Sequence, residues 1–258
     1  MTKLITELFI FILGTAIGSF LNVLIDRLPN EESINGRSHC DYCKKKIAWY
    51  DLIPVLSFFI LGGKSRCCGK KLSWQYLAIE LITGVIFVVV FKDGPYVESL
   101  TRSVLTASIM SCLIIIFVSD FKYHLISDYI LLALFIFSII YHLSSIISIS
   151  LFLYFFISLL IVSLPIFLIY FISKEKAMGL GDVYLSAIIG FLLGWKAGLF
   201  ALYIAFITGA IFGLIAIIFK NKKLKSKIAF GPFLVIGIVV MLFWGEKIVE
   251  MIKKIYGF

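Results

Sequence analysis

Several features of familiar enzyme classes are missing from this 258-residue chain. None of its glycine clusters follows a strand in a βαβ unit, so the sequence contains no dinucleotide-binding fingerprint. No small-x-small cleavage site follows the long apolar run at residues 1–25, so this run is not predicted to be a cleavable signal. We find no internal repeat and no low-complexity tract. Any small-molecule pocket must therefore be built from helices and loops.

Polar residues are also scarce, and this scarcity excludes an ordinary soluble domain. Hydrophobic residues make up 61% of the chain, and the mean hydropathy is +1.07; soluble domains average about 45–50% apolar residues. Apolar runs of about 17 residues or more recur, each long enough to cross a ~30 Å hydrocarbon core. Backbone polar groups must be satisfied within lipid, so these runs are predicted to be helices. The fold class is therefore an all-α polytopic membrane protein.

About eight transmembrane helices are expected, packed as a compact bundle of antiparallel neighbours. The predicted helices are Leu4–Ile25, Tyr76–Phe91, Ser103–Ser119, Ile126–Tyr141, Ile149–Ile172, Val183–Trp195, Ala197–Phe219 and Ile228–Trp244. Little more than Trp195 and Lys196 separates the sixth from the seventh, so seven spans remain an alternative. The loop Asp26–Gln75 is the longest polar segment and the candidate extramembrane domain.

The distribution of Lys and Arg predicts the orientation in the membrane. With eight spans, Asp26–Gln75, the loop at Asp120, Ser173–Asp182 and Lys220–Lys227 lie on one side and hold 17 of the 24 Lys and Arg residues. Cytoplasmic loops carry an excess of Lys and Arg, so this side is expected to be the cytoplasm and both termini to lie outside. The net charge of +9 then indicates topology and anionic lipid, not a nucleic-acid partner.

Two acidic stretches, Ser119–Asp128 and Met178–Asp182, fall on this same side of the membrane. A charged residue at a helix centre costs about 2.5–3.5 kcal/mol on insertion scales, so such residues usually have a function or a partner. Asp120 and Asp182 together could act as general acid and general base on one water molecule. The alternatives are structural: Asp182 as a helix cap, Asp120 paired with Lys122, and Asp128 as a rival partner or helix cap.

The polar loop holds four of the five cysteines: Cys40, Cys43, Cys67 and Cys68. Cytosolic cysteines at this spacing favour a tetrahedral zinc site over structural disulfides. Ser65 stands where the outer cysteine of a second CxxC would fall, so His39 is a reserve ligand and free thiols remain an alternative. Cys112 is expected to be a small packing residue within a helix.

Other residues of interest lie near the polar loop. Glu80, within the second apolar run, is expected either to partner a ligand ammonium or a loop Arg, or to reach the interface. Asn22 and Arg27 are expected to attach the first helix to the loop. The Gly14/Gly18 and Gly190/Gly194 spacings match helix contacts between small residues.

Taken in order, short motifs along the whole chain resemble those of the bacterial type IV prepilin peptidases. The matching pieces are Gly18–Pro29, the cysteine loop, Leu52–Ser57, Tyr76 through Glu80 to Gly84, Asp120 with Leu125–Asp128, Gly179-Leu180-Gly181-Asp182, and Phe230–Leu234. The GxGD motif is shared with presenilin-like proteases, so by itself it does not decide the substrate. The resemblance therefore rests on the occurrence of all these motifs together and in this order.

The resemblance implies an intramembrane aspartyl protease of the GxGD type with two activities at the cytoplasmic face of the cell membrane. It implies that Asp120 and Asp182 cut the leader from prepilins or pseudopilins after a glycine. It also implies N-methylation of the new N-terminal residue from S-adenosylmethionine. Residues 1–92 would carry methyl transfer and zinc, and residues 103–244 the peptidase. The candidate methyl-donor residues are Glu80, Gly84, Asn22 and Arg27.

The sequence departs from the family pattern at four positions: Ser65 replaces a cysteine, Tyr184 a lysine, Ser127 a proline and Asp26 an aromatic residue. None of these changes removes a candidate catalytic carboxylate. Two alternatives to the two-activity enzyme stay open. One is a peptidase without methyl transfer, suggested by Ser65; the other is a transporter in which Asp120, Asp128 and Asp182 form a proton or cation path.

Overall fold

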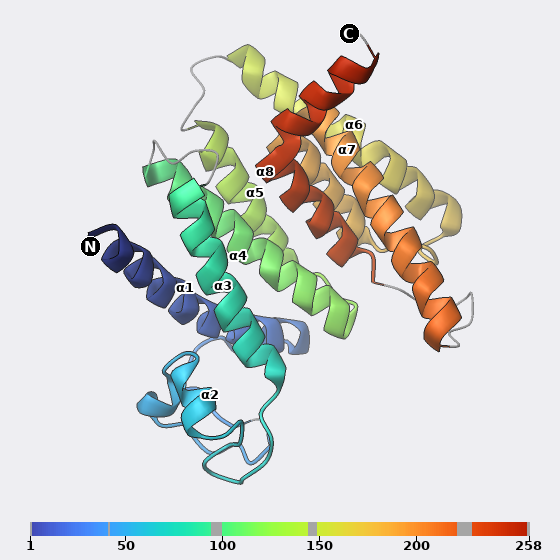
Figure 1. The fold of residues 1–258 in the computed structure, drawn as a ribbon. Coiled ribbons are helices and arrows are strands. Elements are labelled where there is room, and N and C mark those ends of the chain that lie inside the picture. Colours follow the sequence, from blue (N-terminus) through green and yellow to red (C-terminus); the bar gives the residue numbers. More distant parts are fainter. Residues whose placement is uncertain (1, 41, 94–99, 144–148, 221–228, 257–258) are drawn as a thin grey trace. The chain divides into compact units, whose positions relative to one another are not determined.

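The computed structural model describes residues 2–40, 42–93, 100–143, 149–220 and 229–256, and within these ranges the chain is helical, with no strand (Figure 1). The chain divides into two compact units, Met1–Ile115 and Ile116–Phe258, and the boundary falls within helix α4 (Leu100–Tyr123). The predicted division into residues 1–92 and 103–244 stays a prediction.

In the first unit, α1 (Thr2–Arg27) and α3 (Trp74–Asp93) pack closely through glycines. A Cβ atom on Gly14 would lie 2.8 Å from Gly84 Cα, and one on Gly18 would lie 2.8 Å from Glu80 Cα. Both distances are shorter than real Cβ contacts, so only glycine permits this approach. The close crossing brings the polar end of α1 against the polar end of α3.

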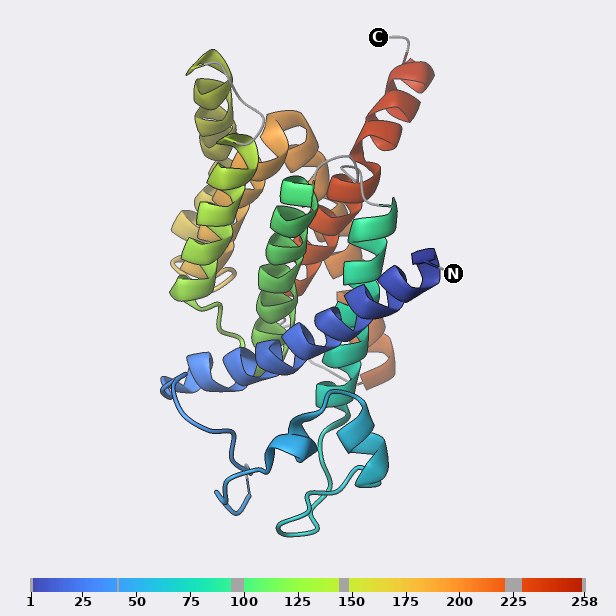
Figure 2. The ribbon, with the colours of Figure 1, turned by 90° about the vertical axis from the view of Figure 1, so that its left-hand side faces the viewer.

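The polar loop between these helices lies at one end of α3 (Figure 2). It contains the short helices η1 (Leu28–Asn30), η2 (Trp49–Leu52) and α2 (Leu56–Ile60). Within α2, Phe58 is buried and its ring lies 5.1 Å from that of Trp74 at the start of α3. The loop therefore has a small apolar contact with the helices, and the remainder of its fold depends on polar interactions.

The second unit contains the end of α4 followed by α5 (Asp128–Leu143), α6 (Ile149–Ser173), α7 (Leu180–Lys220) and α8 (Gly231–Tyr256). Phe191 of α7 is fully buried at its core. The rings that pack against Phe191 come from α5 and α6: Phe135, His142, Phe152, Phe155 and Phe156. This aromatic cluster joins three helices around one side chain.

Helix α7 reverses direction at Gly194, whose φ of 78° and ψ of 165° lie in a region open essentially to glycine alone. A Cβ atom on Gly198 would lie 3.4 Å from Gly190 Cα, although eight residues of straight helix span about 12 Å. The 41 residues of α7 are thus two antiparallel helical segments (Figure 1). Gly194 makes the turn and also packs against α6, as its spacing predicted: an added Cβ would lie 3.1 Å from Tyr154 Oη.

The prediction of about eight helices is confirmed once α7 is counted as two segments within the described residues. In the part of the chain that the structure describes, six helices are long and apolar enough to cross a membrane, α7 among them as one 40-residue stretch, and α5 is a shorter apolar helix. The third predicted helix was too short, because α4 continues through Asp120 to Tyr123. The basic loop at 221–227 and the predicted start at Ile228 lie outside the described residues.

Gly190 offers a test of the packing between α6 and α7. An added Cβ would collide with the carbonyl oxygen of Ser158, so Gly190→Ala is expected to destabilise the protein by about 1–3 kcal/mol. The matched control is Gly245→Ala in α8, where the nearest atom is the flexible end of Met241 at 3.3 Å. Thermal unfolding in detergent measures both variants. Equal stabilities would contradict the close contact at Gly190.

Candidate active site and metal centre

Asp120 lies in the last turn of α4 and is held by the first residue of α8. The backbone N–H of Gly231 donates a hydrogen bond to Asp120 Oδ2 over 2.8 Å, and Asp120 is only 6% exposed. A Cβ on Gly231 would lie 2.6 Å from the same oxygen, so a side chain there would displace the carboxyl group. The N-terminus of a helix presents such unpaired N–H groups. Glycine therefore allows α8 to bring one of them directly to Asp120.

Asp182 is held in a similar way, in the first turn of α7. The backbone N–H of Gly179 donates to Asp182 Oδ2 over 3.1 Å, and the Asp182 N–H donates back to the Gly179 carbonyl over 3.2 Å. A side chain that reaches back to the N–H just before a helix forms one half of a capping box. Asp182 is therefore not an N-cap residue, as the alternative interpretation had it, because it caps from the third position of the helix; the same bond fixes the buried acid in place.

The segment after α4 connects the two acidic stretches within the second unit. The Ser119 hydroxyl donates to the Leu125 carbonyl over 3.0 Å, which folds this segment back onto α4. Ile126 then packs against Gly181, where an added Cβ would lie 3.1 Å from Ile126 Cβ. Asp120 and Asp182, 62 positions apart along the chain, therefore belong to stretches that pack against each other.

Asp128 and Tyr184, unlike Asp120 and Asp182, are exposed. Asp128 is exposed at the first residue of α5, where its charge complements the helix dipole. Tyr184, two residues after Asp182, is 51% exposed, whereas Asp182 is buried. The structure brings together the stretches that hold Asp120 and Asp182, whereas Asp128 lies at a helix start.

In the first unit, the four predicted cysteines lie on two turns of the same backbone form. Residues 38–47 and 63–72 each contain an isolated antiparallel bridge, His39 with Lys46 and Lys64 with Lys71. The inner hydrogen bonds also correspond, from Cys40 N to the Lys45 carbonyl and from Ser65 N to the Lys70 carbonyl. The two turns are related by a shift of 25 positions. The expectation that the chain has no internal repeat is therefore wrong for this short stretch, whose sequence similarity is too brief to recognise by itself.

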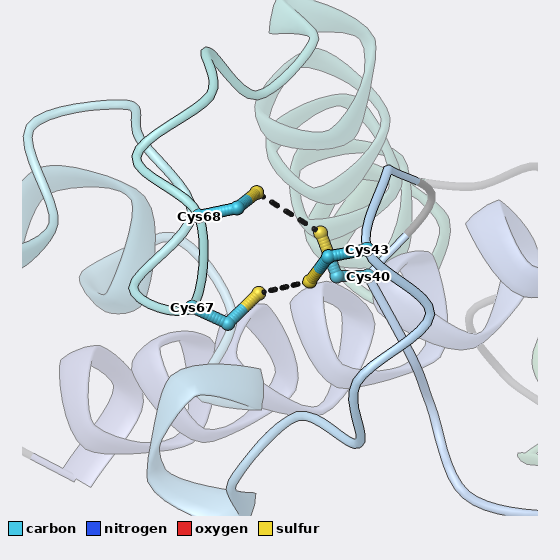
Figure 3. A group of neighbouring side chains, drawn as sticks. All are labelled: Cys40, Cys43, Cys67 and Cys68. Carbon is cyan, nitrogen blue, oxygen red and sulfur yellow. Dashed lines mark hydrogen bonds between the residues drawn. The ribbon is translucent and has the colours of Figure 1, made fainter.

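This correspondence explains the unusual cysteine spacing. Ser65 takes the position of Cys40, and Cys68 that of Cys43, so the second turn reads Ser-x-x-Cys. Cys67, which has no counterpart cysteine in the first turn, supplies the fourth sulfur: its Sγ lies 2.9 Å from Cys43 Sγ. The other pair of sulfurs, Cys68 Sγ and Cys40 Sγ, lies 3.7 Å apart (Figure 3). All four sulfurs lie within 4.8 Å of one another. A tetrahedral zinc site with Zn–S bonds of about 2.3 Å has S···S edges of about 3.8 Å, so the donor set fits such a metal.

The thiols differ in acidity. Burial opposes ionisation of Cys40, but hydrogen bonds from the Ser65 hydroxyl and from the backbone of Cys43 and Tyr42 outweigh it and lower the Cys40 pKa to about 6. The neighbouring Cys43 sulfur raises the pKa of the Cys67 thiol. A metal binds the thiolate form, so Cys40 is ready to bind at neutral pH, whereas Cys67 must lose its proton on binding.

A cavity of about 330 Å³ lies between the polar loop, α1 and α3. Asn22 and Arg27 of α1 and Glu80 of α3 line it, together with Asp26, Ser65 and other loop residues. Arg27 Nη1 donates to the Ser33 and Ile34 carbonyls, which confirms the expected attachment of the first helix to the loop. Asn22 instead bonds to the Tyr76 carbonyl of α3.

Gly84 does not line this cavity. An added Cβ there would lie 2.8 Å from Phe11 and Thr15 of α1, so its role in the structure is the α1–α3 contact. Its assignment to the methyl donor stays a prediction, without support from the described lining residues.

Two contacts that build these sites were missed in the sequence analysis. Gly231 was seen only within a matching motif, although its N–H holds Asp120; the glycine directly before Pro232 at a helix start is the signal. Tyr76 was also seen only within a motif, and its hydroxyl donates to Asp26 Oδ2 over 3.0 Å.

Fold and site together define a multi-pass membrane protein with a buried pair of acids and a cysteine cluster able to hold a metal ion. Comparison with known families gives two matches along the chain. Residues 12–93 match the Bacterial Peptidase A24 N-terminal domain, and residues 107–214 match the Type IV leader peptidase family.

Individual relatives agree with these matches. The chain is 35% identical over 199 residues to a prepilin leader peptidase/N-methyltransferase of Klebsiella pneumoniae, covering 73% of this chain and 86% of that one. It is 29% identical to a protein of the same name from Bacillus subtilis (strain 168), over 95% of this chain and 97% of the relative. No solved structure matches the chain. The chain belongs to the type IV leader peptidase family, as its motifs predicted.

The replacement of a cysteine by Ser65 generates a prediction about metal binding. Cys67→Ser should weaken binding of one Co²⁺ and reduce its thiolate-to-metal absorption, because a thiolate ligand is lost. Ser65→Ala should bind the ion with the full four-sulfur spectrum. The double variant Ser65→Cys/Cys67→Ser restores two equivalent CxxC turns and should recover the spectrum lost in Cys67→Ser.

Purified full-length protein titrated with Co²⁺ provides the measurement. The assignment of Cys67 as the fourth ligand would be contradicted if Cys67→Ser bound Co²⁺ with the affinity and absorption of the unmodified protein. It would also be contradicted if the double variant recovered neither the affinity nor the absorption lost in Cys67→Ser.

Proposed function

We propose that this chain is a membrane aspartic endopeptidase that removes the leader of type IV prepilins or pseudopilins after a glycine. We further propose that it methylates the new N-terminal residue with S-adenosylmethionine. The observation that carries the peptidase proposal is the pair of buried acids, Asp120 and Asp182, each bonded through Oδ2 to a glycine N–H at a helix start. The names of the relatives support the substrate and the second activity.

Peptide cleavage by such a pair is acid–base chemistry. One carboxylate takes a proton from a water molecule, whose oxygen attacks the scissile carbonyl carbon, while the other carboxyl group donates a proton to the substrate. The N–H groups of Gly179 and Gly231 hold the two carboxyl groups in place before the substrate arrives. This preorganisation is what positions the water.

We place the acids and the cysteine loop on the cytoplasmic side of the cell membrane. The support is the excess of Lys and Arg in the loops on that side. A short basic leader would reach the acids from the same side. The relatives do not favour the alternative of a cation-coupled transporter, because their names describe a peptidase.

We assign methyl transfer to the first unit and its cavity. Asn22, Arg27 and Glu80 line the cavity and would hold S-adenosylmethionine, which supplies a methyl group on a sulfonium. Zinc, bound by Cys40, Cys43, Cys67 and Cys68, would tie together a loop that has little apolar core of its own. Cys40 and Ser65 both line the cavity, so a metal at the cysteines would also fix part of its wall.

Replacing either acid tests the peptidase. Asp120→Asn and Asp182→Asn keep the size of the side chain but remove its acid–base chemistry, so leader cleavage should fall at least about a hundredfold. Asp128→Asn, at the exposed start of α5, is the matched control and should cleave normally. Purified variants are assayed on a full-length prepilin, with thermal unfolding to verify the fold. Cleavage retained by either of the first two variants would refute the assignment.

Gly231 tests whether α8 positions Asp120. In Gly231→Ala the added Cβ would meet Asp120 Oδ2 at 2.6 Å and push the carboxyl group from its place. We expect kcat for leader cleavage to fall roughly tenfold or more with little change in KM, because a displaced catalytic group chiefly affects the chemical step. Gly245→Ala in the same helix is the control. A normal kcat in Gly231→Ala, or a loss confined to KM, would show that this contact does not position the acid.

A further inference from the structure

The helical end of the cavity in the first unit is rich in hydrogen-bond acceptors. Ser19, Asn22 and Asp26 of α1 line it at spacings of three and four residues, and so lie along one helix face. Tyr76 and Glu80, four residues apart on α3, line the same cavity. This face of α1 and this face of α3 therefore present polar groups to one shared space.

Asn22 leaves one acceptor unmet there. Its Nδ2 donates to the Tyr76 carbonyl over 3.2 Å and to the Gly18 carbonyl over 3.3 Å, which fixes the orientation of the amide. The opposite atom, Oδ1, is buried and accepts no hydrogen bond from the described residues. The side chain is only 4% exposed. A buried acceptor without a donor is costly, so this atom calls for a ligand that donates.

Glu80 adds a carboxyl group beside it. Oε2 accepts the Val55 N–H over 2.8 Å, and the Ser19 hydroxyl also bonds to this side chain. In the described part of the chain, no Lys, Arg or His forms an ion pair with Glu80. Asp26 contributes a second carboxyl group, held by the Tyr76 hydroxyl.

The basic residues that line the cavity do not balance these acids. Arg27 directs Nη1 at two loop carbonyls, and His39 is the other basic lining residue. The acids that line it are Asp26, Glu32, Asp51 and Glu80, and of these Asp51 is neutralised by the Arg66 guanidinium at 2.9 Å. An anion would be repelled here, whereas a cation that carries several N–H groups would meet both a carbonyl oxygen and carboxyl groups.

We infer that the helical end of this cavity is a binding site for a protonated primary amine, held by Asn22 Oδ1, Glu80 and Asp26. The inference rests on the proposed methyl transfer, which offers two sources of such an amine. One is the amino terminus of the cleaved pilin; the other is the amino group of the methionine part of S-adenosylmethionine. The two carry the same ammonium chemistry.

Direct binding to the full-length protein tests the site. Three ligands are titrated by calorimetry in detergent: a peptide with the mature pilin N-terminus, the same peptide N-acetylated, and S-adenosylmethionine. Glu80→Gln and Asp26→Asn remove charge without changing shape, and Glu31→Gln, an exposed acid of the same loop that does not line the cavity, is the control. Should Glu80→Gln fail to fold, Asp26→Asn provides the test.

The charge-removing variants should lose roughly tenfold to hundredfold in affinity for one amine-bearing ligand, because hydrogen bonds to charged groups are the strong ones. If the variants lose affinity only for the free peptide, and the acetylated peptide binds weakly to every protein tested, the bound amine is that of the pilin. Loss for S-adenosylmethionine alone assigns it to the methyl donor. Unchanged affinities for both ligands would overturn the inference.

A separate measurement keeps this outcome distinct from failure of the proposed function. Mass spectrometry of the mature peptide incubated with unmodified protein and S-adenosylmethionine reports methyl transfer. No added methyl would refute methyl transfer, and the affinities would still decide whether an amine binds.

Discussion

The second unit depends on two hydrogen bonds in which a glycine N–H at a helix start meets a buried carboxyl group. Asp120 bonds to Gly231 at α8, and Asp182 bonds to Gly179 at α7. A buried acid without partners is expensive, and helix N-termini offer unpaired donors and a positive dipole end in the same place. The same bonds that make the acids tolerable in an apolar bundle also orient them. Stability and chemistry thus depend on the same few atoms.

Glycine is the residue that makes each close approach possible. At Gly231 it admits a carboxyl group, at Gly194 it reverses α7, and at Gly14 and Gly84 it lets α1 and α3 cross in contact. In a bundle with little polar surface, packing between small residues replaces the hydrophobic driving force available in water. The polar loop of the first unit uses a different means, because its small apolar contact leaves the cysteine cluster to connect its two turns.

Hydropathy and motif order predicted the helical segments and both candidate acids, because long apolar runs and buried charges are strong local signals. The end of α4 was misjudged, since Asp120 was taken for a loop residue when tertiary contacts extend the helix past it. The contact between Gly231 and Asp120 joins residues 111 positions apart, so a local pattern can mark Gly231 as a helix start but cannot identify Asp120 as its partner. The role of Cys67 depends on a ten-residue backbone repeat, and in the second copy Ser65 stands at the position of Cys40. The cavity could not be predicted from the sequence, because its lining comes from three separate segments: α1, the polar loop and α3.

The proposed chemistry requires Asp120 and Asp182 to act on one water molecule. An experimental structure of the full-length protein with an uncleavable prepilin leader bound would show whether they do. We expect both carboxyl groups to lie within hydrogen-bonding distance of a single water beside the scissile carbonyl, with the Gly179 and Gly231 N–H groups still bonded to them. Carboxyl groups too far apart to share a water, with substrate bound, would contradict it.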